Sequence, residues 1–424
     1  MKASKFNIIV DCNDSTSLIF NLLRNKMVRV HNDNLRKDEP MPRLFDEGFY
    51  VLDDNDEQFT NCFDNIDDGR FLFLTIIPTY DCNFRCEYCW ESFNSSANMD
   101  TDVINNIVQL IEKRKETIKY LEISWFGGEP LLQTELIKAM SEKLRPICAE
   151  SDIALRQKIA TNGYLLTPTN LEILKKSGLS SLVVTLDGPR DIHNQRRFLS
   201  SGGETFDVIL NNIKNIDFID RIDIAVNCDE KNVEHIDVLL DDLTPLKRKI
   251  TLYYRWVFPP IDEWKTFYNT DELEQYNKMA SSKLVELNWK AIKKGYEIRN
   301  PLFHRQPFYC KSDISNHYLI GTNGEVFKCN VEFENKLAYG SLNNNGTIEM
   351  NDIYHEVWHN AYEAKTKKCT NCIFVPKCHG GCAYAFIVSG KNKCKFVSLE
   401  EAKEYIKMMY YFLSSDKETA TIVD

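Results

Sequence analysis

The sequence predicts an α/β protein with a partial barrel of six β/α units followed by a cysteine-rich domain. Strand-like apolar runs alternate with helix-like runs from residue 71 to about 295, which is typical of right-handed parallel β/α units. Cysteines gather in two groups, three within 82–89 and seven within 310–394. At 424 residues the chain is too long for one small core, and two or three domains are expected.

The alternating region contains six expected strands and six expected helices. We expect the strands at 71–78, 120–126, 155–161, 180–186, 221–227 and 249–257. We expect the helices at 101–116, 131–146, 167–176, 206–216, 233–243 and 271–294. The predicted domains are an N-terminal region at 1–70, the barrel at 71–299, the cysteine-rich domain at 300–395, and a helix with a tail at 396–424.

The N-terminal region carries the weakest pattern. Short strands are expected at Phe6–Val10 and Met27–His31, with one or two helical turns at Ser17–Leu23 between them. The acidic run 53–57 is interpreted as a solvated linker. Two interpretations stay open: a small lid that packs on the next domain, which we favour, or a module that docks a peptide by strand addition.

The loop after the first strand carries three cysteines in eight residues, Cys82, Cys86 and Cys89. Thiolates this close together can hold one compact metal centre, and four of them would close an iron–sulfur or zinc site. Three thiolates leave one corner of the centre open, so this loop is predicted to be catalytic. A zinc site completed by a distant ligand is the alternative.

Three further unusual loops follow the next three strands: 126–130 (Phe-Gly-Gly-Glu-Pro), 161–163 (Thr-Asn-Gly) and 185–189 (Thr-Leu-Asp-Gly-Pro). The carboxyl ends of parallel strands meet at one edge, where such sheets carry their active sites. Glycines there let a ligand approach the backbone closely, and a tight turn is the structural alternative. The candidate ligand-binding residues on these loops are Gly127, Gly128, Glu129, Asn162, Thr185 and Asp187.

The Cys-x3-Cys-x2-Cys spacing, with the aromatic Tyr88 before its last cysteine, resembles the signature of radical S-adenosylmethionine (SAM) enzymes. The resemblance implies that Cys82, Cys86 and Cys89 bind three irons of a [4Fe–4S] cluster whose fourth iron chelates SAM. One electron then cleaves SAM to methionine and a 5′-deoxyadenosyl radical, which abstracts hydrogen from a substrate. Tyr88 is expected against adenine.

Two other segments strengthen this resemblance. The Gly-Gly-Glu-Pro turn that ends in Glu129 is similar to the family's site for the methionine amino group. The segment 187–197 resembles one found in SAM-dependent peptide and protein maturases, in which an arginine four residues after a histidine lies near the SAM carboxylate. Arg197 holds that position here, and its planar fork suits a carboxylate. Asn162 would offer an amide, and Thr185 and Asp187 would contact ribose.

The seven C-terminal cysteines are an awkward number for two closed zinc sites, which need eight ligands. Their spacing resembles the SPASM extension of radical SAM enzymes, which binds two auxiliary clusters, expected to be [4Fe–4S]. The implied ligands are Cys310, Cys329 and Cys382 for the first cluster, and Cys369, Cys372, Cys378 and Cys394 for the second. Some members have an eighth cysteine where this chain has His304. His304 could be a ligand, another residue could replace it, or the cluster could keep an open iron.

The resemblance implies a maturase that modifies a ribosomally made peptide by forming a thioether or carbon–carbon crosslink or by oxidising a residue. The peptide could carry a leader segment. A flavodoxin or ferredoxin would supply electrons. Alternatives are a formylglycine-forming enzyme similar to anaerobic sulfatase maturases, which His304 counts against, a small-molecule radical SAM enzyme, and a non-catalytic zinc scaffold.

The composition limits the partners and the location of the chain. A net charge of −10 argues against nucleic acid as a partner. The N-terminus does not read as a signal peptide, and no apolar run reaches membrane length. We therefore expect a cytoplasmic protein. The resemblance to radical SAM enzymes, which carry iron–sulfur clusters, implies an oxygen-sensitive protein from an anaerobe.

Overall fold

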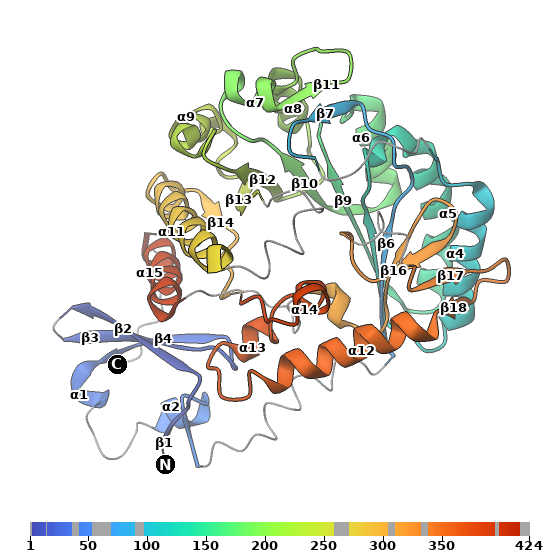
Figure 1. The fold of residues 1–424 in the computed structure, drawn as a ribbon. Helices are drawn as coiled ribbons and strands as arrows, with labels where there is room; N and C mark the ends of the chain where they lie inside the picture. Colours follow the sequence, from blue (N-terminus) through green and yellow to red (C-terminus); the bar gives the residue numbers. More distant parts are fainter. Residues whose placement is uncertain are drawn as a thin grey trace. The chain divides into compact units, whose positions relative to one another are not determined.

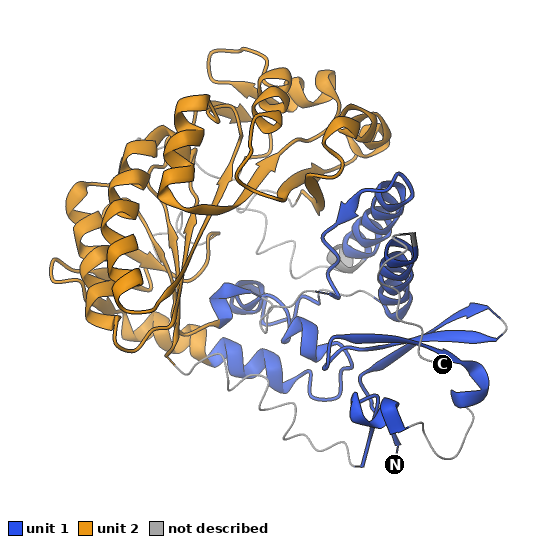
Figure 2. Cartoon of the chain, turned by 180° about the vertical axis from the view of Figure 1, so that it is seen from behind, with its two compact units in different colours: residues 1–66, 268–313, 360–424 blue, residues 67–267, 314–359 orange. Residues whose placement is uncertain are grey.

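The computed structural model describes residues 2–13, 15–35, 42–52, 69–89, 97–257, 271–303, 310–331, 338–394 and 398–415. Contacts divide the chain into two compact units, coloured separately in Figure 2. Unit 1 consists of residues 1–66, 268–313 and 360–424. Unit 2 consists of residues 67–267 and 314–359.

Unit 2 contains the predicted barrel strands, and all six are confirmed (Figure 1). Each pairs in parallel with the next one in the chain, which is the arrangement expected of a partial β/α barrel. The strands are β6 (Phe71–Ile76), β8 (Tyr120–Trp125), β9 (Ala154–Thr161), β10 (Leu179–Thr185), β12 (Ile222–Cys228) and β13 (Ile250–Trp256).

The helices of unit 2 alternate with these strands as predicted, although two of the predicted helices begin as 3₁₀ turns. Helices α4, α5 and α6 pack side by side in sequence order (Figure 1). The helical elements are α4 (Thr101–Arg114), η1 (Pro130–Gln133), α5 (Thr134–Glu150), α6 (Pro168–Ser177), α7 (Arg190–Arg196), α8 (Phe206–Lys214), η2 (Val233–His235), α9 (Ile236–Asp242) and η3 (Thr244–Leu246).

Local chemistry explains why these elements form where they do. Strand β6 is buried at five of its six positions, because a parallel strand is covered on both faces. Helix α4 begins where the Asp100 carboxylate accepts from the backbone N–H of Asp102. Helix α6 begins at the Thr167 cap and ends at Gly178, whose φ of +83° suits glycine.

The sheet of unit 2 continues beyond the first barrel strand. Strand β15 (His317–Ile320) pairs in parallel with β6, with His317 beside Phe73. Three antiparallel strands follow: β16 (Glu325–Phe327), β17 (Gly340–Leu342) and β18 (Ile348–Met350). Residues 314–359 therefore pack with the barrel, although the sequence-based boundary at residue 300 places them in the cysteine-rich domain.

The N-terminal part of unit 1 is a three-stranded antiparallel sheet of β2 (Asn7–Asn13), β3 (Thr16–Asn21) and β4 (Lys26–His31). The two predicted strands are confirmed, but the predicted helical turns at Ser17–Leu23 are wrong. This segment forms most of the central strand, and every residue of β3 is buried. Its apolar residues are too few to separate a helical period from a buried strand.

Short elements complete this part of unit 1: β1 (Lys2–Ala3), β5 (Tyr50–Val51), α1 (Asn32–Leu35) and α2 (Pro42–Asp46). One side of the sheet packs on a buried apolar cluster of Ile19, Val28, Val30, Leu44 and Phe49. This burial accounts for the folding of a segment whose sequence pattern is weak.

The rest of unit 1 is mainly helical. The predicted helices at 271–294 and 399–412 are confirmed as α11 (Asp271–Lys293) and α15 (Leu399–Ser415). They pack together, and Trp289 Nε1 donates to Glu404 Oε2 at 2.8 Å. The other elements are β14 (Glu297–Ile298), η4 (Lys311–Asp313), α12 (Asp352–Lys367, shared with unit 2), α13 (Val375–Cys378) and α14 (Ala383–Ser389).

Three sequence expectations fall on residues outside the described ranges: the acidic linker at 53–57, the ligand His304 and most of the C-terminal tail. Among the helices that are described, none combines the length and the apolar character needed to cross a membrane.

Candidate active site

The cysteine loop lies at the carboxyl end of β6 and is fixed to a distant segment by a short sheet. Strand β7 (Phe84–Cys86) pairs antiparallel with β11 (Arg197–Leu199). Cys86 is the register partner of Arg197, and Phe84 is the partner of Leu199. This pairing could not be predicted, because strands of three residues are too short to show an alternating pattern. The pairing brings two sequence-predicted residues, Cys86 and Arg197, side by side.

Cys82 lies at the start of the loop with its thiol largely buried. Burial raises the pKa of this thiol to about 12, although the Phe84 N–H donates to its Sγ at 3.4 Å. Asn162 approaches the same place, because its Nδ2 donates to Asn83 Oδ1 at 2.8 Å and lies 4.0 Å from Cys82 Sγ. A buried thiol that resists ionisation alone fits a metal ligand, since a metal centre stabilises the thiolate.

The Gly127–Gly128 turn packs directly against the backbone that leads into the cysteine loop. Gly127 has a φ of +115°, and a Cβ there would lie 2.7 Å from the Thr79 carbonyl oxygen. A Cβ on Gly128 would lie 2.2 Å from the Asp81 carbonyl oxygen. The two glycines are therefore required for packing, in addition to any role beside a ligand.

Glu129, next in the chain, is fully buried. Its carboxylate accepts from Thr161 Oγ1 at 2.6 Å, Asn162 N at 2.7 Å and Leu131 N at 3.0 Å. Burial raises the pKa of Glu129, and these donors oppose that rise. The side chain thus ties the loop after β8 to the loop after β9. Its assignment to a ligand amino group remains a prediction.

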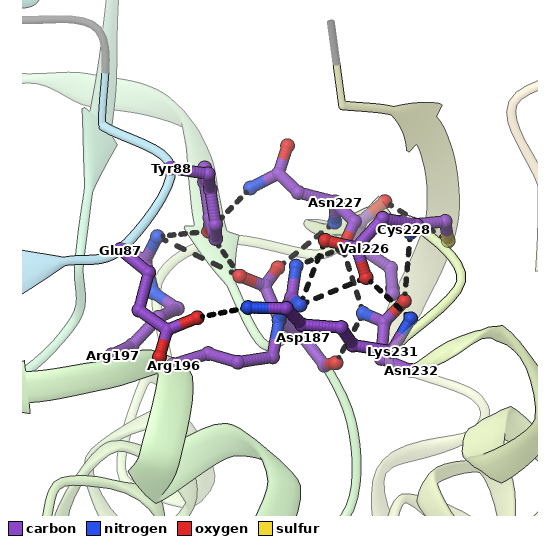
Figure 3. A network of polar contacts seen from close by, with 11 residues as sticks. Glu87, Tyr88, Asp187, Arg196, Arg197, Val226, Asn227, Cys228, Lys231 and Asn232 are labelled. Atoms are coloured by element: carbon purple, nitrogen blue, oxygen red, sulfur yellow. Dashed lines mark hydrogen bonds and ion pairs between the residues drawn. The ribbon is translucent and has the colours of Figure 1, made fainter. Parts of the chain in front are cut away.

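The Tyr88 hydroxyl is the centre of a polar network that joins the cysteine loop to β10 and β12 (Figure 3). It donates a short hydrogen bond to the Asp187 carboxylate. It accepts from Arg197 Nη1 at 2.7 Å and from Asn227 Nδ2 at 2.9 Å. The Arg196 guanidinium lies 5.1 Å from the ring centroid. Burial raises the pKa of Tyr88 well above its usual value.

Asp187 is fully buried and is held from several directions. Its Oδ1 accepts from Asn227 N at 2.8 Å, and its carbonyl accepts from Asn232 Nδ2 at 2.6 Å. Its own N–H donates to His193 Nδ1 at 3.2 Å. Thr185, the other predicted ribose contact, lies two residues earlier, in register with Ala225.

His193 performs a structural role in this arrangement. Because Nδ1 accepts from Asp187, Nε2 carries the proton and donates to Thr205 Oγ1 at 3.2 Å. Thr205 Oγ1 in turn donates to the Arg197 carbonyl at 2.6 Å. Burial, with the nearby Arg197 and Arg196 charges, lowers the pKa of His193 well below its usual value. The imidazole is therefore neutral and connects two segments of the site.

Arg197 carries a buried donor that no described residue satisfies. Its side chain is 10% exposed, and its Nε is buried without a hydrogen-bond partner among the described residues. Its Nη1 lies 3.9 Å from Asp187 Oδ2. Burial would lower the pKa of Arg197, but Tyr88, Cys86 and Asp187 raise it above its usual value. A charged, buried donor without an acceptor fits the carboxylate of a ligand.

The structure adds residues that the sequence analysis did not select. Asn227 and Asn232 hold Tyr88 and Asp187, as described above. Arg196 forms an ion pair with Asp229 that supports the same turn, because its Nη1 donates to both carboxylate oxygens, at 2.9 Å and 2.8 Å. The only signal available was the mostly polar run 227–232, which begins at the end of the fifth strand. Such a run is common in loops, so it does not single out these side chains.

Comparison with known proteins identifies the domain that carries this site. The sequence model of the Radical SAM superfamily matches residues 76–243. This chain contains a radical SAM domain. The predicted family and fold class are thereby confirmed. The superfamily implies a [4Fe–4S] cluster that works with SAM.

Two relatives are similar in sequence to part of this chain. Radical SAM cyclopropyl synthase TigE of Paramaledivibacter caminithermalis is 26% identical over 209 residues, 44% of this chain and 42% of TigE. GTP 3′,8-cyclase of Clostridium acetobutylicum is 28% identical over 212 residues, 47% of this chain and 60% of the cyclase. The matched segments thus span about half of each relative.

A solved structure shares the fold more widely. Native anSMEcpe with bound AdoMet and Kp18Cys peptide has a TM-score of 0.60 and 17% sequence identity. The match covers 82% of this chain and 100% of that one. At this identity the likeness concerns the fold alone.

The four cysteines assigned by resemblance to the second auxiliary cluster lie close together in unit 1. Burial raises the pKa of Cys394 to about 11, and Cys378, Cys369 and Cys372 add to the rise. Burial also raises the pKa of Cys369, with contributions from Cys378 and Cys372. Asn392 Nδ2 donates to Cys369 Sγ at 3.3 Å. Mutual repulsion between thiolates is what a shared metal centre would relieve.

The described residues hold no group of three ligand-type side chains in the geometry of a single metal ion.

The cysteines assigned to the first auxiliary cluster fall in both units. Cys310 and Cys382 belong to unit 1, and Cys329 follows β16 in unit 2. Burial, with Asp313 and Cys382 nearby, raises the pKa of Cys310 to about 11. The three ligand assignments remain predictions.

Proposed function

We propose that this chain is a radical SAM maturase that reductively cleaves SAM and abstracts hydrogen from a ribosomally made peptide. The modification would be a thioether or carbon–carbon crosslink, or the oxidation of a residue. One observation carries the proposal: Tyr88 ties the Cys82–Cys89 loop to Asp187 and Arg197, which both lie in the connection between β10 and β12. SAM has to contact both the cluster and the residues that bind it, so the loop that holds the cluster must lie close to those residues.

The chain's own residues would hold SAM in a defined orientation. The buried Arg197 Nε supports binding of the SAM carboxylate, because a charged donor gains most from a charged acceptor. In this proposal Asp187 would accept from ribose hydroxyls, and Asn162 would contact the cofactor beside Cys82. Cys82, Cys86 and Cys89 would hold a [4Fe–4S] cluster, which would supply the electron that splits SAM. The burial of the surrounding side chains would keep water from the reactive fragment.

A peptide substrate is supported by the second cysteine group and by the comparisons. Oxidising a peptide residue releases a second electron, and auxiliary clusters bound by the 310–394 cysteines would carry it away. The solved anSMEcpe structure, which shares the fold, has a peptide bound. We further propose flavodoxin or ferredoxin as the electron donor.

The test is reductive SAM cleavage by anaerobically reconstituted protein with dithionite, measured as 5′-deoxyadenosine by liquid chromatography. Wild-type protein should form it, and Cys86→Ala should not. Cys148→Ala changes a buried cysteine on α5 outside the site and should retain the activity. Equal 5′-deoxyadenosine from wild type and Cys86→Ala would overturn the assignment.

The substrate class requires a second measurement. Short peptides encoded beside the gene, co-produced with the enzyme, should show a mass change of one or more hydrogen pairs. GTP serves as the small-molecule comparison, because one relative is a GTP cyclase. Conversion of GTP with no peptide change would replace the peptide proposal with a small-molecule one.

A further inference from the structure

The sixth barrel strand, β13, presents two side chains on the face that also carries Asn227. In the parallel register Asn227 lies beside Arg255, and Ala225 lies beside Tyr253. Register partners in neighbouring parallel strands point to the same side of a sheet. The Asn227 amide on this side reaches the Tyr88 hydroxyl. Arg255 therefore stands next to the network at the cysteine loop, on its side of the sheet.

The opposite face of β13 is core. Leu252, Tyr254 and Trp256 alternate with Tyr253 and Arg255 along the strand, and their exposed fractions are only 0%, 6% and 5%. Arg255 itself is exposed. The strand thus has one packed face and one face that solvent or a ligand can reach, which separates Arg255 from a core role.

Arg255 is also ready to bind an anion. Its guanidinium carbon lies 5.5 Å from the Tyr253 ring centroid, a stacking contact that restrains the long side chain. Among the residues that the structure describes, no carboxylate forms an ion pair with it. Two cations nearby differ in this respect: Arg196 pairs with Asp229, and Lys231 pairs with Glu87 at 2.8 Å.

We propose that Arg255, positioned by Tyr253, binds a carboxylate of the substrate beside the radical site. The proposal rests on the proposed function, and it names the substrate class: a peptide with an acidic side chain or a free C-terminus close to the residue that is modified. A planar guanidinium stacked on one face keeps its N–H edge available for bidentate binding of a carboxylate. In a chain with a net charge of −10, such a cation offsets the repulsion that an acidic peptide would meet.

SAM also carries a carboxylate, and Arg197 is the better candidate for it. Arg197 is buried within the Tyr88 network and has an unpartnered Nε, whereas Arg255 is exposed on the neighbouring strand. The affinity for SAM therefore separates the two sources of a carboxylate.

The experiment measures peptide binding to the reconstituted, SAM-loaded enzyme by saturation-transfer NMR under anaerobic conditions. The probes are three capped tripeptides: acetyl-Gly-Glu-Gly-amide, its Gln analogue, and acetyl-Gly-Gly-Gly with a free C-terminus. Wild type should bind one carboxylate peptide about fivefold more tightly than the Gln analogue, the upper end for an exposed ion pair. The preferred peptide identifies whether the carboxylate is a side chain or a C-terminus.

Three variants carry the test. Arg255→Met should remove the preference, and Arg255→Lys should keep part of it, because lysine keeps the charge but loses the fork. Lys231→Met is the matched control: it removes a cation near the same edge that already pairs with Glu87, and it should keep the preference.

A wild type without any preference for a carboxylate would overturn the proposal, and so would a preference that survives in Arg255→Met. A tenfold loss of SAM affinity in Arg255→Met with unchanged peptide binding would assign Arg255 to SAM and overturn it too. The wild-type enzyme should form 5′-deoxyadenosine without peptide. If the wild type forms no 5′-deoxyadenosine, the proposed function fails. The peptide-binding comparison would still decide whether Arg255 binds a carboxylate.

Discussion

Removing the Tyr88 hydroxyl tests the network that joins the cysteine loop to the barrel. In Tyr88→Phe the ring remains, so packing and the contact with Arg196 are preserved. Asp187 loses a donor, and Arg197 and Asn227 each lose an acceptor. All of these contacts lie in a buried region, where a lost partner is not replaced by bulk water.

The expected cost follows from those contacts. Each buried group left without a partner costs about 1–3 kcal/mol, and a charged group costs more. Part of this is recovered, because Arg197 Nη1 already lies 3.9 Å from Asp187 Oδ2 and the two can approach each other. We therefore expect a net loss of about 2–3 kcal/mol in the free energy of unfolding, well below the sum of the separate penalties.

The assay is urea unfolding of reduced, cluster-free protein, followed by circular dichroism. At a slope of about 2–3 kcal/mol per molar, typical of urea, the midpoint should fall by about 1 M. Tyr164→Phe is the control, since the Tyr164 hydroxyl has no hydrogen bond within the described residues. A midpoint for Tyr88→Phe that matches the Tyr164→Phe midpoint would refute the reasoning.

Four further outcomes are expected. Cys86→Ala should form no 5′-deoxyadenosine in the anaerobic assay, and retained formation would break the assignment of the cluster loop. Cys372→Ala should keep part of the SAM cleavage but lose peptide product by mass spectrometry, whereas a normal yield would contradict an essential second auxiliary cluster. Lys365→Met removes the buried ion-pair partner of Asp313, 2.8 Å away, and should lower the free energy of unfolding by about 3–5 kcal/mol in thermal unfolding. A Lys365→Met/Asp313→Leu double variant that recovers none of this stability would argue against the ion pair as the cause. Asn392→Ala removes a hydrogen bond to Cys369, a proposed cluster ligand, and that bond favours the reduced cluster. A redox titration followed by electron paramagnetic resonance should therefore give a more negative midpoint potential. An unchanged potential would mean that the Asn392 amide only holds the backbone.

The barrel could be predicted from the sequence because its strands are nearly continuous apolar runs. Strand β6 is buried at five of six positions, and such a run, bounded by turn residues, has few other interpretations. The segment 17–23 failed for the opposite reason: it is short, mixes polar with apolar residues, and becomes a central strand only because β2 and β4 pair with it. Tertiary pairing decided its structure.

The site was predictable to a similar degree. Cys86 and Arg197 could be predicted as site residues, because each stands at a characteristic spacing within its own segment of the sequence. Asn227 was not selected, because an asparagine at a strand end has no spacing that marks it. The partners of the Tyr88 hydroxyl depend on how segments far apart in the sequence pack together, and no local sequence pattern predicts that packing.

The most direct test of the account is the iron and sulfide content, with Mössbauer spectra, of anaerobically reconstituted protein beside a Cys82/Cys86/Cys89 triple-alanine variant. The account predicts about twelve irons per chain, as three [4Fe–4S] clusters, falling by about four in the variant. About eight or ten irons in the wild type would indicate a missing or smaller first auxiliary cluster. Stoichiometric zinc without iron would contradict the account.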